Sequence, residues 1–320
     1  MTHSVTIVYP DADEDESARH KLQFDRLREV AELKIFTGVP ESNEVYIDRI
    51  GDADGLLLSW NLPKPVLTAN PQLKTICFLG SGAEKFVDIE MARINQTSVL
   101  NCPGYSDHTV AEHCMALLLA SCRQIPQLHQ KLQSGVWNQS EPAIELNGKT
   151  IGLVGFGGIG KKFSHLCKAF GMRVLVWNRT SSDDLAREYG IEFCDLPELL
   201  RNSDIISLHL TATPETQNLI NRNAFDQMNR GCLLINTARA ELIVESDLID
   251  ALDHGTLGAA ALDVFHQEPL PGNHPLIGRK NVILSPHVAY NTPESTDRLF
   301  QIAVDNLIEF FTKGSCHNML

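Results

Sequence analysis

A glycine-rich turn between two periodic segments limits this chain to a small set of folds. The segment Lys-Thr-Ile-Gly-Leu-Val at 149–154 closes with a short apolar run and leads into Gly-Phe-Gly-Gly-Ile-Gly at residues 155–160, and helical spacing follows over residues 163–170. In such a unit the first glycine permits a tight turn, the second lets the backbone approach a pyrophosphate, and the third lets the helix pack on its strand. Gly171 stands where a helix C-cap glycine belongs, before a strand expected at 172–177. The pattern predicts a dinucleotide bound at the helix N-terminus.

The bulk composition excludes several other classes of protein. The net charge of −13 provides no basic surface, so we expect no nucleic-acid partner and no attraction to anionic membranes. No run approaches the roughly 20 apolar residues of a membrane helix, and no signal peptide is visible, so the protein is expected in the cytoplasm. The eight cysteines are scattered without a Cys-x-x-Cys pair, and no metal site is expected.

Alternating short apolar runs and helical segments organise the whole chain. Strands are expected at 5–9, 35–36, 55–59, 75–79 and 99–101, then at 204–210, 232–236, 258–264 and 282–284. A helix is expected over 15–33 with Leu22, Leu27 and Val30 inward, and others over 106–123 and 292–311. The prediction is an α/β chain of two doubly wound parallel-sheet domains. A Rossmann nucleotide domain, 102–290, is inserted into a flavodoxin-like substrate domain made of 1–101 plus 291–320.

The residues after the second strand of the nucleotide unit bear on the choice of cofactor. An NAD site usually places Asp or Glu about 20 residues beyond the glycines, to bond the ribose 2′-hydroxyl. Here Asn178 and then Arg179 occupy that region. A neutral amide does not repel a 2′-phosphate, and an arginine can pair with one, so NADP is expected in preference to NAD. The alternative is that Arg179 is a surface arginine beside an NAD site.

Three candidate catalytic side chains follow three successive predicted strands. Arg239 ends Asn-Thr-Ala-Arg at 236–239, Glu268 follows the strand that ends near Asp263, and His287 lies in Ser-Pro-His-Val-Ala at 285–289. Individually they could be a surface charge, a loop carboxylate and a turn histidine. Because the carboxyl ends of parallel strands meet at one sheet edge, the three together predict an active site.

These motifs, in this order, resemble those of the D-isomer-specific 2-hydroxyacid dehydrogenases over nearly the full length of the chain. The resemblance extends to Val-Ala-Glu-His at 110–113, Ala-Leu-Asp-Val at 261–264 and Leu-Gly-Ser-Gly at 79–82. It implies that His287 is the general acid, that Glu268 supports its imidazole and that Arg239 binds the substrate carboxylate. It also implies a homodimer formed through the region of the 106–123 helix, whose apolar face has more aliphatic surface than one domain contact needs.

The resemblance also implies the binding residues. The cofactor-binding set is Gly155, Gly157, Gly158, Ile159, Gly160, Asn178, Arg179, Leu210, Thr237, Ala238, Arg239, Asp263 and His287, with Asp263 expected to contact the nicotinamide carboxamide. Backbone N–H groups at Ser81 and Gly82, together with Arg239, are expected to receive the substrate carboxylate. The glycines of this loop could instead simply shape a strand-to-helix turn.

Departures from the family pattern narrow the expected substrate. Ala240-Glu241 replaces a usual Gly-Gly pair, and His209-Leu210-Thr211 stands where His-x-Pro is common. Ser59 stands where phosphoglycerate dehydrogenases typically carry an arginine for the substrate phosphate, and no regulatory domain follows Leu320. A small unphosphorylated 2-oxo acid, hydroxypyruvate or glyoxylate, is therefore expected. The alternatives are a short phosphoglycerate dehydrogenase and, from another class, a dinucleotide-sensing corepressor-like protein.

Overall fold

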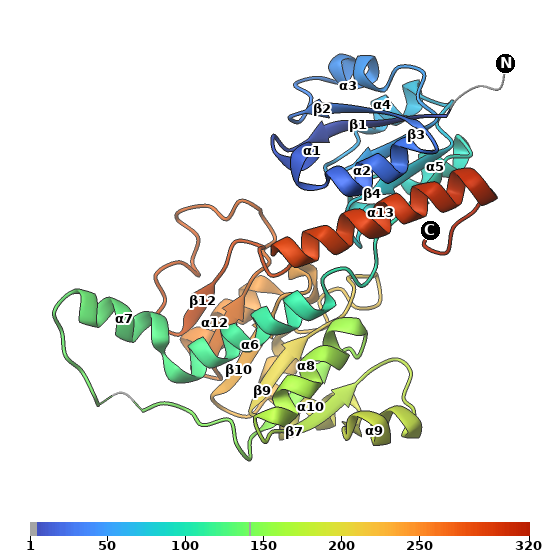
Figure 1. Ribbon diagram of the computed structural model, residues 1–320. Coiled ribbons are helices and arrows are strands. Elements are labelled where there is room, and N and C mark those ends of the chain that lie inside the picture. Colours follow the sequence, from blue (N-terminus) through green and yellow to red (C-terminus); the bar gives the residue numbers. More distant parts are fainter. Residues whose placement is uncertain (1–4, 141) are drawn as a thin grey trace. The chain divides into compact units, whose positions relative to one another are not determined.

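The computed structural model describes residues 5–140 and 142–320, which form two compact units (Figure 1). One unit comprises Met1–Ser106 with Thr292–Leu320, and the other comprises Asp107–Asn291. The chain therefore divides after Ser106 and after Asn291, whereas the boundaries expected from the sequence fell after residues 101 and 290. Within the described residues, no helix is long and apolar enough to span a bilayer.

The first unit is built on a five-stranded parallel sheet. Its strands are β1 (Thr6–Ala12), β2 (Glu32–Thr37), β3 (Gly55–Leu58), β4 (Thr75–Phe78) and β5 (Ser98–Leu100), in the order β2-β1-β3-β4-β5. This is the flavodoxin-like order that was predicted, with its switch point between β1 and β3. β1, β3 and β4 are buried along their whole length, because helices cover both faces of a parallel sheet.

Two layers of helices cover that sheet. Phe24 and Leu27 of α2 (Lys21–Arg28) and the apolar face of α13 (Pro293–Lys313) pack on one side. Residues of α3 (Asn43–Ile50), α4 (Lys64–Ala69) and α5 (Ile89–Ile94) pack on the other. The short helices α1 (Glu16–Arg19) and η1 (Ala83–Lys85) follow β1 and β4.

The helix expected over residues 15–33 is wrong in its extent. The chain forms α1 and α2, and its last two residues belong to β2, which pairs in parallel with β1 at the sheet edge. Leu27 is buried as expected, whereas Leu22 is 73% exposed and Val30 is only partly buried. Pairing with β1 outweighs local helical periodicity at the end of this segment, because β2 completes the sheet there.

The chain after the second unit returns to complete the first. Thr292 caps α13 by accepting a hydrogen bond from the Ser295 N–H at 3.2 Å. Beyond α13, Asn101 N–H donates to the Asn318 carbonyl at 3.1 Å and Leu320 N–H donates to the Val99 carbonyl at 2.9 Å. These bonds add a short antiparallel segment to the free edge of β5, so that the unit contains residues from both sides of the insertion.

The second unit contains a seven-stranded parallel sheet. Its strands are β6 (Thr150–Val154), β7 (Arg173–Trp177), β8 (Glu192–Phe193), β9 (Ile205–Leu208), β10 (Cys232–Asn236), β11 (Leu257–Leu262) and β12 (Val282–Leu284). Their order, β12-β11-β10-β9-β6-β7-β8, is the Rossmann order extended by one strand, so the predicted Rossmann arrangement is confirmed. The switch point lies between β6 and β9, which carry the glycine loop and His209 at their carboxyl ends.

Helices cover both faces of this sheet as well. Buried residues of α6 (Asp107–Arg123) and α8 (Gly158–Ala169) pack on one face, near α9 (Asp183–Tyr189). Residues of α10 (Leu196–Asn202), α11 (Arg222–Gln227) and α12 (Glu245–Asp253) pack on the other, and η2 (Ala240–Leu242) follows β10. The predicted helix over 106–123 is confirmed, and Val110, Cys114, Leu117 and Leu118 are all buried.

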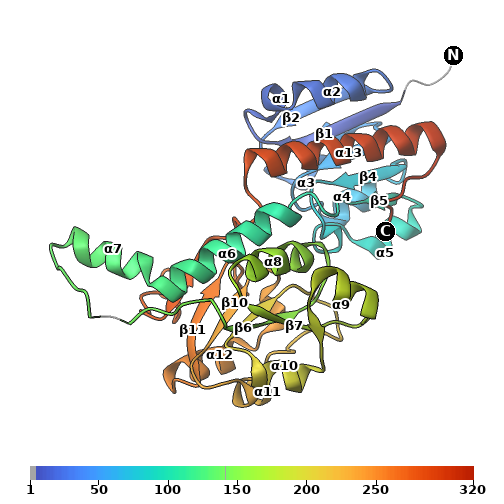
Figure 2. The ribbon, with the colours of Figure 1, turned by 60° about the horizontal axis from the view of Figure 1, so that its bottom comes forward.

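Three elements of this unit, α7 (Ile125–Gln133), β8 and α10, were not predicted from the sequence. α7 follows α6 directly, and α7 with residues 134–140, which we call the arm, projects from the rest of the unit (Figures 1 and 2). The apolar residues Ile125, Leu128 and Leu132 have helical spacing, so the sequence does carry a signal for this helix, although no residue of α7 is buried.

Candidate active site at the carboxyl edge of the seven-stranded sheet

The glycine loop after β6 can be built only from glycines at two of its positions. Gly155 has a φ of +105°, and a Cβ there would lie 2.6 Å from the His209 carbonyl oxygen on the neighbouring strand. A Cβ at Gly160 would lie 2.7 Å from the Gly155 carbonyl oxygen. Gly157, by contrast, faces open space, since a Cβ there would have no heavy atom within 4 Å. The loop is therefore closed against the sheet and open at Gly157.

The open side of the loop is the N-terminus of α8. Gly157 is the N-cap, and the first helical bond runs from Lys161 N–H to the Gly157 carbonyl at 3.0 Å. The N–H groups of Gly158, Ile159 and Gly160 precede that bond and point out of the helix end with its partial positive charge. An accessible glycine beside free N–H donors fits a pyrophosphate, so these residues suit the dinucleotide that the sequence predicts.

Asn178, at the end of β7, connects the glycine loop to the next turn. Its Oδ1 accepts a hydrogen bond from Phe156 N–H at 3.2 Å, and its Nδ2 donates to the Thr180 carbonyl at 2.9 Å. Arg179 is exposed, and its positive charge contributes to lowering the pKa of Glu215, after that carboxyl's own hydrogen bonds with Thr213 and the backbone. The turn after β7, where the sequence predicts the cofactor ribose, thus carries a neutral amide and a neighbouring guanidinium.

His209 and Leu210 follow β9 on the other side of the switch point. Burial lowers the pKa of His209 to about 3, so its imidazole is neutral and packs edge-on against the Phe163 ring with centroids 5.5 Å apart. Leu210 is partly buried, and a Cβ at Gly155 would lie 2.9 Å from its Cδ2. Both residues line the glycine loop, at the positions where the chain departs from the His-x-Pro pattern.

The loop after β10 presents Arg239 at the carboxyl edge of the sheet. The buried Asn236 side chain braces this loop, since its Nδ2 donates to the Arg239 carbonyl at 2.9 Å and its Oδ1 accepts from Ala238 N–H at 3.0 Å. The Arg239 Nη1 donates to the Ala238 carbonyl at 2.7 Å, and the side chain is part-buried. A guanidinium has five N–H donors and this bond uses one of them, so the group retains donors for an anion.

Glu268 and His287 form a hydrogen-bonded pair from neighbouring loops. His287 Nδ1 and Glu268 Oε2 are 2.8 Å apart, and each side chain is about two-fifths exposed. An ionised carboxylate can only accept, so Nδ1 carries the proton and Nε2 is the ring nitrogen left to act on a ligand. The other oxygen of Glu268 accepts from Phe265 N–H at 2.9 Å, which fixes the carboxylate.

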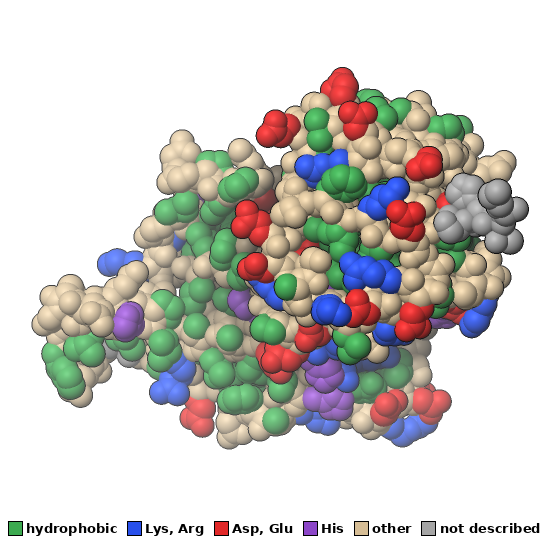
Figure 3. Space-filling model, turned by 45° about the horizontal axis from the view of Figure 1, so that its top comes forward, with side chains coloured by type: hydrophobic (Ala, Val, Ile, Leu, Met, Phe, Trp, Pro, Cys, Tyr) green, Lys and Arg blue, Asp and Glu red, His purple; other side chains and the backbone are tan. Residues whose placement is uncertain are grey.

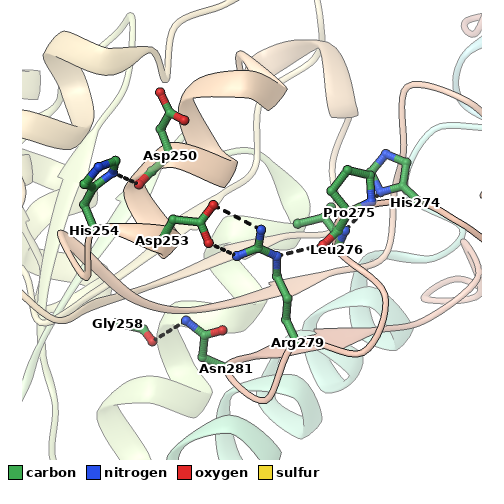
Figure 4. Close-up of polar contacts among 9 residues, drawn as sticks. All are labelled: Asp250, Asp253, His254, Gly258, His274, Pro275, Leu276, Arg279 and Asn281. Carbon is green, nitrogen blue, oxygen red and sulfur yellow. Dashed lines mark hydrogen bonds and ion pairs between the residues drawn. The ribbon is translucent and has the colours of Figure 1, made fainter.

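Hydrogen bonds of Arg279, just before β12, hold the end of the loop that bears Glu268. Arg279 makes two hydrogen bonds to Asp253 at the end of α12, at 2.5 and 3.3 Å, and its Nε donates to the Pro275 carbonyl at 2.7 Å (Figure 4). Closer to Glu268, His266 Nε2 lies 3.1 Å from the Ile243 carbonyl oxygen. The loop is thus tied to the unit on both sides of Glu268.

Asp263 lies at the end of β11 and is fully buried. Its Oδ1 accepts from Ser285 Oγ at 2.6 Å and from Val288 N–H at 3.0 Å, and its Oδ2 accepts from Ala289 N–H at 2.9 Å. The carboxylate therefore binds the turn that carries His287. The sequence predicted only that Asp263 contacts the nicotinamide carboxamide, and it did not predict this second contact.

The residues expected to bind substrate through backbone groups lie in the first unit, after β4. Gly80 N–H donates to the Phe78 carbonyl at 2.9 Å, and the Gly80 carbonyl accepts from Cys102 N–H at 2.8 Å. Ser81 is exposed, and its carbonyl accepts from Asn101 Nδ2 at 3.2 Å, while Gly82 begins η1. The loop is an ordered turn whose next residues start a helical segment.

Ser59, after β3 of the first unit, lies in an acidic cluster. Its N–H and that of Trp60 donate to the buried Asp11 carboxylate at 3.1 and 2.8 Å. The Ser59 hydroxyl lies 2.5 Å from the Tyr9 hydroxyl, which also bonds Glu16 Oε2 at 2.5 Å. Burial raises the pKa of Asp11, and carboxyl groups rather than cations surround this serine.

His113 and Ser285 were not predicted as site residues, yet their side chains are 3.0 Å apart although 172 positions separate them. Both stand inside motifs that carry the resemblance, but nothing in their local pattern indicates the contact. Among residues 5–140 and 142–320, no cluster of three or more His, Cys, Asp or Glu side chains could hold a metal ion.

Comparison with known proteins agrees with this geometry. The protein-family model described as "D-isomer specific 2-hydroxyacid dehydrogenase, NAD binding domain" matches residues 115–289. The hydroxypyruvate reductase of Blautia hydrogenotrophica is 37% identical over 292 residues, which cover 89% of each chain. The D-3-phosphoglycerate dehydrogenase of Methanocaldococcus jannaschii is also 37% identical, over 84% of this chain but only 51% of its own length.

A solved structure matches nearly the whole chain. The acyclic imino acid reductase Bsp5, in complex with NADPH and D-Arg, superimposes with a TM-score of 0.87 at 28% identity, and the match covers 99% of this chain and 100% of that one.

Proposed function

The chain belongs to the D-isomer specific 2-hydroxyacid dehydrogenases, and on that basis we propose that it reduces hydroxypyruvate or glyoxylate with NADPH. Its family uses NAD or NADP to interconvert 2-oxo and 2-hydroxy acids, and the glycine loop fits the pyrophosphate of either cofactor. The observation that carries the proposal is the Glu268–His287 pair at 2.8 Å, one loop away from Arg239 along the same sheet edge.

Each of the three side chains has one task in the proposed reaction. The nicotinamide cofactor supplies the hydride when it is bound. His287 donates a proton from Nε2 to the carbonyl oxygen, while Glu268 holds Nδ1 and stabilises the imidazolium. Arg239 binds the substrate carboxylate with charge-assisted hydrogen bonds. The N–H groups of Ser81 and Gly82, in the first unit, are the carboxylate donors that the family resemblance implies.

The remaining assignments concern the cofactor. Glycines 155, 157, 158 and 160 with Ile159 surround the pyrophosphate, Asn178 and Arg179 meet the ribose, and Leu210, Thr237 and Ala238 line the path toward the nicotinamide. Asp263 lies beside the carboxamide end of that path while it bonds the 285–289 turn. These residues all follow the carboxyl ends of β6, β7, β9, β10 and β11, which supports the roles proposed for them.

The substrate is expected to lack a phosphate. Because Ser59 is bonded among Asp11, Tyr9 and Glu16, a phosphate dianion there would meet carboxyl groups instead of a guanidinium. We expect kcat/KM for hydroxypyruvate to exceed that for phosphohydroxypyruvate by about tenfold or more, as a charge-assisted bond is worth about 1.5–3 kcal/mol. A panel of 2-oxo acids, followed by loss of nicotinamide absorbance, measures this ratio. A preference for the phosphorylated acid would favour a short phosphoglycerate dehydrogenase instead.

NADPH is expected to outperform NADH in kcat/KM by about tenfold or more, the effect of one charge-assisted phosphate contact. Asn178 presents no negative charge to a 2′-phosphate, and Arg179 is exposed beside it. Steady-state kinetics with both cofactors give the ratio, and Arg179→Ala should reduce it. Arg187→Ala, which removes an exposed arginine of α9, is the matched control and should leave the ratio unchanged. Equal efficiencies with the two cofactors would contradict the assignment.

A homodimer is the expected assembly. The sequence indicated the apolar face of the 106–123 helix as its interface, whereas the exposed apolar side chains lie on the arm. The apolar face of α6 is already buried within its own unit. The arm instead exposes Ile125, Leu132, Val136 and Trp137, the last at 75%, and Figure 3 shows hydrophobic side chains on this projecting part. Exposed apolar side chains gathered on one segment are typical of a surface that another chain covers, and a second copy is the simplest partner.

Light scattering at micromolar concentration should therefore return twice the single-chain mass of 35.5 kDa. Trp137→Asp should shift the mass toward one chain, because burying an unpaired carboxylate is unfavourable. Leu22→Asp, at a 73% exposed leucine outside the arm, is the control and should leave the dimer intact. A single-chain mass for the unaltered protein would exclude the dimer.

We place the protein in the cytoplasm. All eight cysteines are free thiols, and six of them are buried. Burial raises the pKa of several of these thiols, such as Cys114 and Cys232 to about 12, so they remain protonated and suit a reducing compartment. Cell fractionation with an antibody against the chain tests this location.

A further inference from the structure

Two neighbouring residues of α6 each contact a loop that bears a candidate catalytic side chain. His113 Nε2 lies 3.0 Å from Ser285 Oγ in the loop of His287, and Cys114 Sγ lies 3.0 Å from Thr237 Oγ1 in the loop of Arg239. The His113 side chain is 23% exposed, and Cys114 is fully buried. α6 thus reaches the ends of β10 and β12 through consecutive side chains.

The hydrogen bonds that start at His113 can run in only one direction. Asp263 is an acceptor when ionised, so the Ser285 hydroxyl donates its single proton to Asp263 Oδ1, at 2.6 Å. The Ser285 oxygen is then the acceptor toward His113, whose Nε2 must carry a proton. The chain of donors therefore runs from His113 to Ser285 to Asp263.

Asp263 in turn holds the turn that carries His287. Its two oxygens accept the N–H groups of Val288 and Ala289, at 3.0 and 2.9 Å, and His287 N–H donates to the Ser285 carbonyl at 3.0 Å. Between these anchors His287 has a φ of +52°, in the left-handed region that only a few per cent of residues other than glycine adopt. Such a conformation persists only where its surroundings fix it.

We propose that His113 and Ser285 are positioning residues, which act through Asp263 to hold the 285–289 turn so that His287 presents Nε2 to the substrate. The proposal rests on the proposed function, because it gives His287 the role of general acid. It adds a task for α6, which no part of the family resemblance supplied. Neither His113 nor Ser285 contacts the reacting atoms in this scheme.

The first test is Ser285→Ala, which removes the hydroxyl and leaves the backbone of the turn. We expect kcat for reduction to fall about 10- to 100-fold, the order of loss caused by a small misplacement of a reacting group. The Kd for NADPH should stay close to that of the unaltered enzyme, and the melting temperature should fall by only a few degrees, because Asp263 keeps the N–H donors of Val288 and Ala289. Ser285→Thr should restore most of kcat. His113→Asn should resemble Ser285→Ala, whereas His108→Asn, at an exposed histidine of the same helix, should behave like the unaltered enzyme.

A double-mutant cycle separates a positioning role from a structural one. If Ser285 acts through His287, then adding Ser285→Ala to His287→Ala should cause no further loss of kcat. Additive losses, or parallel losses of kcat and melting temperature, would overturn the inference while leaving the general acid in place. Near-normal turnover by His287→Ala alone would overturn the proposed function, and the positioning role with it.

Discussion

Replacing His287 with alanine is expected to lower kcat for reduction of the oxo acid by about 10²–10⁴-fold, the usual contribution of a general acid. The variant removes Nε2, the only ring nitrogen that the bond to Glu268 leaves free. Hydride acceptance by a carbonyl leaves an alkoxide unless a proton arrives, so chemistry is affected more than binding. Steady-state loss of nicotinamide absorbance at saturating substrate measures the effect, and Glu268→Gln should show the same effect in milder form.

His266→Ala is the control for that experiment. This histidine lies two positions before Glu268 and contacts the Ile243 carbonyl through Nε2, away from the pair of catalytic side chains. Its replacement removes one tie of the loop, but the Phe265 N–H still fixes the Glu268 carboxylate, so kcat should fall far less than in His287→Ala. Near-normal turnover by His287→Ala, or an equal loss in the two variants, would remove His287 from the acid role.

Replacing Arg239 with alanine should raise KM for the oxo acid by about tenfold or more, since charge-assisted hydrogen bonds to a carboxylate are worth about 1.5–3 kcal/mol. The loop itself should persist, because Asn236 braces it through the Arg239 carbonyl and the Ala238 N–H, which the substitution retains. Cofactor affinity, measured by fluorescence titration with NADPH, should change little.

Arg239→Lys sharpens that prediction. A lysine keeps the charge but loses the planar pair of donors that matches a carboxylate, so its KM should lie between those of the unaltered enzyme and Arg239→Ala. An unchanged KM for Arg239→Ala would show that the substrate carboxylate is bound elsewhere, with the Ser81–Gly82 loop as the first place to look. A loss of NADPH affinity would instead assign the arginine to the cofactor.

The glycine loop and both sheets could be predicted from the sequence because their signals are local. The loop needs glycine at 155 and 160 for reasons that lie within a few residues, apart from the contact with the His209 carbonyl. The buried strands are dominated by apolar residues, as expected of parallel strands with both faces covered. The candidate catalytic residues were found because each lies in the loop that follows one of the predicted strands.

Features that depend on distant partners could not be predicted in the same way. β2 lies at a sheet edge with alternately exposed residues, so its pairing with β1 is not evident from its composition. α7 has apolar residues at helical spacing, but none of its residues is buried, so the spacing does not indicate that the helix projects from the unit. The contact between His113 and Ser285 depends on α6 crossing the sheet, and neither residue alone indicates it.

The insertion of one unit into the other also sets an order in which the chain can fold. The second unit is one continuous segment, Asp107–Asn291, whereas the first needs α13 and the segment that pairs with β5. During synthesis, the ribosome therefore releases every residue of the second unit before it releases the helix that covers one face of the first sheet. The nascent first unit already has α2 for that side of its sheet, but the apolar surface that α13 covers stays open to solvent, or to chaperones, until this last helix emerges.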